Sequence, residues 1–146
     1  MPETKQEVLQ RFAPHYADTM GGVPKDDVVV GDIPQTLALL ADLDPLVFEG
    51  YSLIRQYAMA REPEGHMPLK YKHLILVALD LARENQKGAC NHIREAIREG
   101  LDIEEVRETL ALALMVEGIV MWGKIGKHVL AFAEEFAAEF SAREKS

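Results

Sequence analysis

The sequence predicts an all-α protein, a bundle of six or seven helices. Apolar residues recur at helical spacing through most of the 146 residues, and Pro, Gly and capping residues separate the periodic stretches. The one strand-like run, Val28–Val30, has no second candidate to pair with, so we interpret it as an extended loop. The length predicts a single domain, residues 1–146, with an N-terminal helix and connector at 1–32 and a helical core at 33–143.

Three helices are expected in the N-terminal half. The first, residues 4–20, contains Pro14, which is expected to bend or divide it. Residues 21–24 end this helix, and residues 25–31 form a connector. The second helix is expected at 33–43. The third starts at Pro45 behind the N-cap Asp44 and runs to about residue 60. Its apolar positions are Leu46, Val47, Tyr51, Ile54, Tyr57 and Ala58.

A pair of helices follows the polar break at 61–67. The first, residues 69–84, is apolar almost all round, which is typical of a buried helix. On this helix His73, Val77, Asp80 and Glu84 share one side. Lys87 and Gly88 interrupt the apolar pattern, so the second helix is expected at 89–99, with Gly100 as its stop.

The C-terminal third predicts two helices. Asp102 and Glu105 form a capping box for the first of them, and its apolar stripe extends to Glu117 before Gly118 breaks the helix. The last helix, residues 119–143, carries a sharp apolar stripe and ends in a polar tail. The members of that stripe are Trp122, Ile125, Val129, Phe132, Ala133, Phe136 and Phe140.

A motif in the helix pair resembles the carboxymuconolactone decarboxylase family, which includes the alkyl hydroperoxidase D-like proteins. The matching residues are His92-x-x-x-Ala96-x-x-x-Gly100 followed by Leu101-Asp102-Ile103-Glu104-Glu105, together with Lys72-His73-Leu74-Ile75. The resemblance covers residues 33–128 and is strongest over 70–106. It implies an all-α bundle that forms trimers or hexamers.

The departures from the family motif concern its chemistry. The two cysteine positions of the family's peroxidases, seven and four residues before the histidine, are Asn85 and Gly88 here. The glutamate of the family's proton relay is replaced by His73, so only His92 is kept among the four catalytic positions. The resemblance therefore implies that the two-cysteine disulfide cycle cannot run within this chain.

Five side chains are candidates for the site. His92 is the main proton-transfer candidate, because imidazole exchanges protons near neutral pH; it could instead be a histidine bonded to a backbone carbonyl. His73 could pair with His92 or be a satisfied core histidine, and Asp80 could orient His73 or add a third metal ligand. Glu117 could carry a raised pKa in its apolar stripe, or reach solvent at the helix end.

Cys90 is the only cysteine of the chain. It could be a reactive thiol near a helix N-terminus or a small buried apolar side chain. Cys90 and His92 lie about 160° apart on a helical wheel, so they cannot touch within one regular helix. A single cysteine forms no internal disulfide, which favours a reducing, cytoplasmic location.

These observations leave three functional hypotheses. The first is an acid/base enzyme, a decarboxylase-like lyase that acts on a small metabolite without cofactor or metal. The second is a one-cysteine peroxidase using Cys90 and an outside thiol. The third is a non-enzymatic binding protein. The net charge of −8 argues against nucleic acid or anionic membrane as a partner. The many apolar helix faces favour a homo-oligomer.

Overall fold

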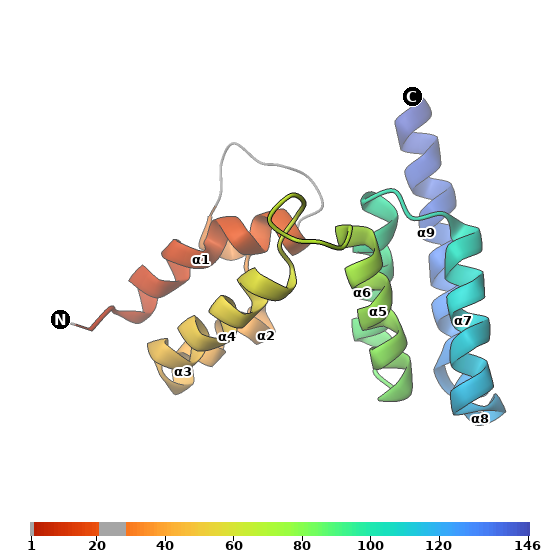
Figure 1. Ribbon diagram of the computed structural model, residues 1–146, viewed down its shortest axis with the longest axis horizontal. Helices are drawn as coiled ribbons and strands as arrows, with labels where there is room; N and C mark the ends of the chain where they lie inside the picture. The colour runs from red at the N-terminus through yellow and green to blue at the C-terminus, as the bar shows by residue number, and fades with distance from the viewer. Residues whose placement is uncertain (1, 21–28) are drawn as a thin grey trace. The chain divides into compact units, whose positions relative to one another are not determined.

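The computed structural model describes residues 2–20 and 29–146. Within these ranges the regular structure is helical and no strand occurs, which confirms the predicted all-α class. Contacts between residues divide the chain into two compact units, Met1–His66 and Met67–Ser146, which are described separately here (Figure 1). The boundary falls in the predicted polar break, and the single-domain organisation stays a prediction. The predicted helix end at 21–24 and residues 25–28 of the connector lie outside the described residues.

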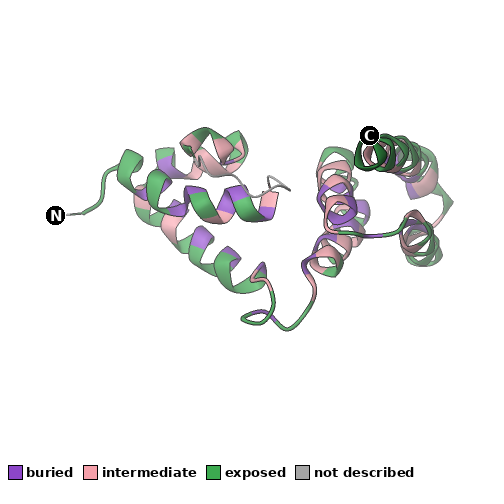
Figure 2. Ribbon diagram, turned by 90° about the horizontal axis from the view of Figure 1, so that it is seen from above, coloured by how far each residue is buried: buried purple, intermediate pink, exposed green. Residues whose placement is uncertain are grey.

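The first unit is built on α1 (Lys5–Met20) and α4 (Pro45–Ala58). Its core is an aromatic cluster in which the ring of Phe48 lies 5.9 Å from that of Phe12 and 5.7 Å from that of Tyr16, centre to centre. All three side chains are almost completely buried. Figure 2 shows buried and exposed residues alternating along these helices, as the amphipathic pattern requires.

Pro14 does not divide the first helix, which was one of the two outcomes expected. It lies inside α1, which continues to Met20. Proline removes one backbone hydrogen bond, to the carbonyl four residues earlier, and here that carbonyl belongs to Gln10. Both Pro14 and Gln10 are exposed, so water can satisfy the carbonyl without a break in the helix.

The predicted helix at 33–43 is wrong in its boundaries. Residues 30–43 form a 3₁₀ turn (Val30–Asp32) and two short helices, α2 (Gln35–Ala38) and α3 (Leu40–Leu43). Ile33 is extended and Pro34 occupies the N-cap position of α2, because the residue before a proline avoids helical geometry. The helical region therefore starts two residues later than predicted and is interrupted at Leu39.

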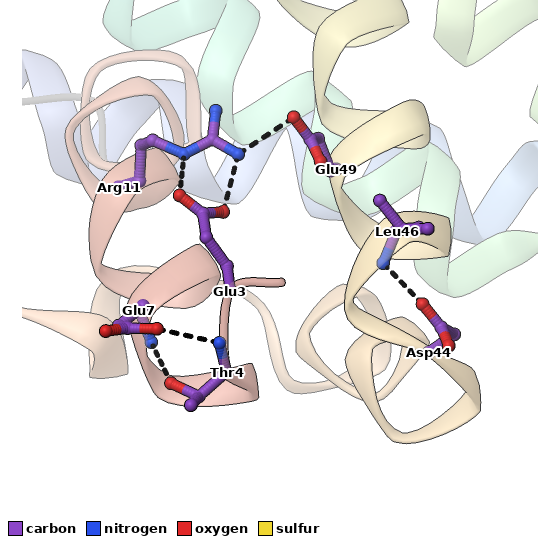
Figure 3. Close-up of polar contacts among 7 residues, drawn as sticks. All are labelled: Glu3, Thr4, Glu7, Arg11, Asp44, Leu46 and Glu49. Atoms are coloured by element: carbon purple, nitrogen blue, oxygen red, sulfur yellow. Dashed lines mark hydrogen bonds and ion pairs between the residues drawn. The ribbon is translucent and has the colours of Figure 1, made fainter. Parts of the chain in front are cut away.

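Charged contacts fasten the start of α1 to α4 (Figure 3). The guanidinium of Arg11 donates to both carboxylate oxygens of Glu3, at 3.0 and 2.8 Å, and lies 2.9 Å from Oε1 of Glu49. Asp44 caps α4 as predicted, accepting a 2.8 Å hydrogen bond from the backbone N–H of Leu46.

The buried face of α4 is not the apolar face that the sequence shows. Phe48, Ser52 and Arg55 are the buried residues of this helix. All six positions named above are instead exposed: Leu46, Val47, Tyr51, Ile54, Tyr57 and Ala58. Burial on α4 therefore follows a mixed apolar and polar stripe, whose polar members bond to side chains of α1.

The second unit contains α5 (Leu69–Ala82), α6 (Gln86–Arg98), α7 (Ile103–Glu117) and α9 (Lys127–Lys145). Helix α6 packs against both α5 and α9, and α7 also contacts α5 and α9 (Figure 1). The core of this unit includes Val77, Ile93, Val106 and Val129, all fully buried. One side of α5 remains exposed at Ile75 and Leu79, so the prediction of a helix buried all round is only partly right.

The ends of these helices follow the predicted signals. Asp102 and Glu105 form the capping box of α7. Gly100 and Gly118 have φ angles of 98° and 87°, which favour glycine and which end α6 and α7. Beyond Gly118, α8 (Ile119–Met121) passes into a π turn (Trp122–Gly126) and then into α9. Among the described residues, every helix is too short or too polar to cross a bilayer.

Candidate functional site

The link between α5 and α6 brings the two predicted histidines together. It is a Schellman turn: the N–H of Asn85 donates to the carbonyl of Asp80 at 2.8 Å, and the N–H of Glu84 donates to Leu81 at 3.1 Å. Glu84 has the positive φ, 55°, that this turn requires. A turn this short folds α6 back along α5, and a residue of α6 then faces His73.

That residue is His92. Its Nδ1 lies 3.0 Å from Nδ1 of His73, which is hydrogen-bonding distance. The ring centres are 5.3 Å apart and the ring planes are inclined by 35°. Two neutral imidazoles can make this contact only if one Nδ1 carries a hydrogen and the other does not. The arrangement therefore holds one proton between the two rings.

The environments of the two rings differ. His73 is completely buried, beside Val77 on the same face of α5. The His92 side chain keeps 16% of its surface exposed, and its Nε2 lies 4.0 Å from Oδ2 of Asp80. A positive charge is stabilised by a nearby carboxylate and disfavoured by burial, so an imidazolium is more stable at His92 than at His73. Asp80 thus lies near His92, whereas the sequence suggested that it could orient His73 or add a metal ligand.

Asn85 bonds to the Asp80 carboxylate and is itself bonded to Gly88, and we call these three residues the Asp80 clamp. Asn85 donates from Nδ2 to Oδ1 of Asp80 at 3.2 Å, while its own Oδ1 accepts from the backbone N–H of Gly88 at 3.1 Å. A side chain at position 88 would crowd this contact, because a Cβ there would lie 2.4 Å from Asn85 Nδ2 and 2.7 Å from Asp80 Oδ2. Partial burial raises the pKa of Asp80, and the bond from Asn85 opposes that rise.

This role of Asn85 and Gly88 was not predicted from the sequence. The second helix was expected to start at Ala89, after an interruption at Lys87-Gly88, whereas α6 starts at Gln86 with Asn85 as its N-cap. The available signal was an asparagine three residues before a glycine, at the start of an amphipathic stretch.

Cys90 lies on a different side of α6. It is partly buried and packs against the core of the second unit. Burial raises the pKa of its thiol, and the charge of Arg94 offsets this only in part. A thiol whose pKa is raised is mostly protonated at neutral pH and is a poor nucleophile.

Glu117 is the last residue of α7 and is exposed. Of the two interpretations of this residue, the position fits the one in which its carboxylate reaches solvent beside Gly118. It belongs to a different helix from the histidine pair and the Asp80 clamp.

The described side chains form no group of three His, Cys, Asp or Glu able to hold a metal ion.

The pair of His73 and His92 can exchange protons. Because Nδ1 of His92 faces His73, Nε2 is the atom at which His92 would give a proton to a bound molecule or take one from it. Asp80 would stabilise the imidazolium formed when it takes one.

A family model and a solved structure both match this chain. The model of the carboxymuconolactone decarboxylase family matches residues 45–123, which include the pair and the clamp. A crystal structure from Burkholderia xenovorans LB400, described as a candidate carboxymuconolactone decarboxylase, shares 38% identity. The likeness covers 96% of this chain and 98% of that one, with a TM-score of 0.81. None of the curated proteins compared with the chain matches it.

Proposed function

Because the chain belongs to the carboxymuconolactone decarboxylase family, we propose that it is an acid/base enzyme in which His92 transfers the proton. The substrate class is a small metabolite that carries a carbonyl or carboxylate group, such as a lactone acid. The observation that carries the proposal is the 3.0 Å contact between Nδ1 of His73 and Nδ1 of His92, with Asp80 on the other side of His92.

Each of the three side chains has a separate task. His92 gives or takes the proton at Nε2. His73 fixes the orientation and the tautomer of the His92 ring through the Nδ1 contact, as the orienting group of a catalytic triad does. Asp80 stabilises the charged form of His92.

In a lactone decarboxylation the pair would act on an enolate. Loss of CO₂ leaves the bonding electrons on a carbon conjugated with the lactone carbonyl, and the negative charge spreads to the carbonyl oxygen. A protonated His92 beside that oxygen lowers the energy of the enolate and can then protonate its carbon. This step requires no group beyond the side chains named.

The test is turnover of a carboxymuconolactone, followed as CO₂ release. His92→Gln is expected to lower kcat/KM by about 100-fold or more, the range that a positioned acid or base contributes. Asp80→Asn is expected to lower it by ~10-fold, because the charge that stabilises the imidazolium is lost. Turnover by His92→Gln at the wild-type rate would remove the proposal.

Cys90→Ser is the matched control, because it changes a neighbouring residue of α6 outside the pair. We expect it to leave kcat/KM unchanged. If Cys90→Ser abolishes a peroxide-dependent activity and His92→Gln does not, the one-cysteine peroxidase is the better account, although the raised pKa of Cys90 argues against it. An absence of turnover on every lactone and peroxide tested would favour the binding-protein alternative.

A further inference from the structure

The buried face of α4 carries an arginine without a described counter-charge. Arg55 is 8% exposed, and its Nε is buried without a hydrogen-bond partner. Of the residues described in the first unit, no Asp or Glu pairs with it, and the carboxylate of Asp18, on the same helix as Thr19, is bonded to Arg61 at 2.9 Å. Burial of an unpaired guanidinium is unfavourable, and no negative group among the described residues balances this one.

The contacts that Arg55 does make are weak. Its Nη2 lies 3.4 Å from the hydroxyl oxygen of Thr19, which itself donates to the carbonyl of His15 at 2.9 Å. Its Cζ lies 5.4 Å from the centre of the Tyr16 ring, a cation–π contact. The Tyr16 hydroxyl is bonded to Ser52 at 2.8 Å. None of these groups carries a negative charge that could balance the guanidinium.

The unsatisfied atoms lie on one edge of the guanidinium. Nε and Nη2 of an arginine point the same way and together bind two oxygens of a carboxylate, sulfate or phosphate. On Arg55 this edge has no partner at Nε and only the long Thr19 contact at Nη2. A second buried nitrogen without a partner, Nε2 of His15, belongs to the same helix as Thr19.

We propose that Arg55, with His15, binds a small oxyanion at the interface of α1 and α4. The oxyanion accepts two parallel hydrogen bonds from Nε and Nη2 of Arg55 and one from Nε2–H of His15. This site uses neither His73 nor His92 and does not rest on the proposed function.

The lowered pKa of His15 is what we expect when no anion is bound at this site. Burial first, and then the charge of Arg55, lowers the pKa of His15 to about 4, while Asp18 opposes this. An anion between the two side chains would cancel the effect of Arg55. The pKa of His15 should therefore rise when the anion binds, which gives a second measurement at the same site.

The test is a titration of the ¹⁵N-labelled protein with sodium acetate, sulfate and phosphate, against sodium chloride at equal ionic strength. The NMR signal of Arg55 Nε–H should shift and saturate with at least one oxyanion and not with chloride. The anion that binds most tightly identifies the shape of the group that the site accepts. Acetate would indicate a planar carboxylate, and sulfate or phosphate would indicate a tetrahedral group. The His15 ring signals, followed against pH, should show a higher pKa in that anion.

Variants separate the effect of the paired N–H donors of Arg55 from the effect of its charge. Arg55→Lys keeps the positive charge but loses the two parallel N–H donors. It should bind the oxyanion at least ~10-fold more weakly, the effect of losing one hydrogen bond to a charged group. Arg143→Gln, at an exposed arginine of α9, should bind as the wild type does. The proposal is overturned if no oxyanion shifts Arg55 Nε–H beyond chloride, or if Arg55→Lys binds as tightly as the wild type. The wild-type titration decides even if a variant fails to fold.

Discussion

The difference between His73 and His92 follows from where each side chain lies on its helix. His73 shares the buried side of α5 with Val77, so its ring is closed off from solvent. His92 lies at the margin of α6, partly exposed and near Asp80. The proposed function therefore gives two identical side chains different tasks, because a low-polarity environment disfavours charge and a neighbouring carboxylate favours it.

His15 gives a prediction for stability against pH. Its pKa is about 4 in the folded chain and near 6.5 when unfolded, so between these values the unfolded chain binds more protons. Stability therefore falls as pH drops from about 6.5 to about 4, by about 1–2 kcal/mol once solvent contact is allowed for. Urea unfolding at both ends of this range, followed by circular dichroism, measures the loss.

His15→Gln should reduce the stability loss, since glutamine does not titrate. His128→Gln, at an exposed histidine of α9, controls for loss of an imidazole elsewhere. An equal loss of stability in wild type and His15→Gln would show that His15 does not contribute to the acid sensitivity.

At the scale of helices, the α5–α6 turn is the part that sequence analysis predicts least well. Lys87-Gly88 is interpreted as a break because glycine is a poor helix former. In the structure, the side chain of Asn85 caps the N–H of Gly88, so the helix starts before the glycine. The capping signals of Asp44 and of Asp102 with Glu105 are predicted correctly, because those contacts depend only on neighbours in the sequence.

The wrong face predicted for α4 has a related cause. Ser52 and Arg55 are polar, so hydrophobicity alone places them outside. They are buried because Tyr16 and Thr19 of α1 supply partners, and a local pattern contains no information about partners 36 residues away. The contact of His73 with His92 could be anticipated only as one of several possibilities, because the sequence leaves the relative rotation of the two helices open.

Gly88→Ala tests the clamp on Asp80. The added Cβ would displace the ends of Asn85 and Asp80, so kcat/KM on the substrate is expected to fall about 10-fold. The unfolding temperature should hold or rise slightly, because alanine favours a helix by up to about 1 kcal/mol. Gly50→Ala is the matched control, since it is also a helical glycine and its Cβ would meet nothing within 4 Å.

Unchanged turnover and unchanged His92 ring signals in Gly88→Ala would mean that the clamp does not position Asp80. Lower turnover in Gly50→Ala as well would point to a general effect of the substitution on the chain.

At the scale of the whole molecule, assembly is the open prediction. An apolar patch on α7 and α8 consists of Leu112, Met115, Val116, Ile119 and Val120, which are 63–82% exposed. Soluble monomers rarely expose contiguous apolar surface of this kind. The patch agrees with the trimer or hexamer that the family resemblance implies, and we propose that copies of this chain cover it.

Met115→Lys is expected to shift the protein from trimer or hexamer to monomer, because a charge would be buried without a partner in the contact. Light scattering after size-exclusion chromatography measures the mass. Ser141→Lys adds the same charge at an exposed position of α9 and should leave the mass unchanged. A monomeric wild type would contradict the proposal directly.

The central claim is the proton held between the two histidines, and ¹⁵N NMR of the histidine-labelled protein tests it most directly. We predict one protonated and one unprotonated Nδ1, with a scalar coupling across the hydrogen bond that joins them, lost in His73→Gln. Two Nδ1 signals without coupling, and a His92 signal unchanged by His73→Gln, would contradict the account.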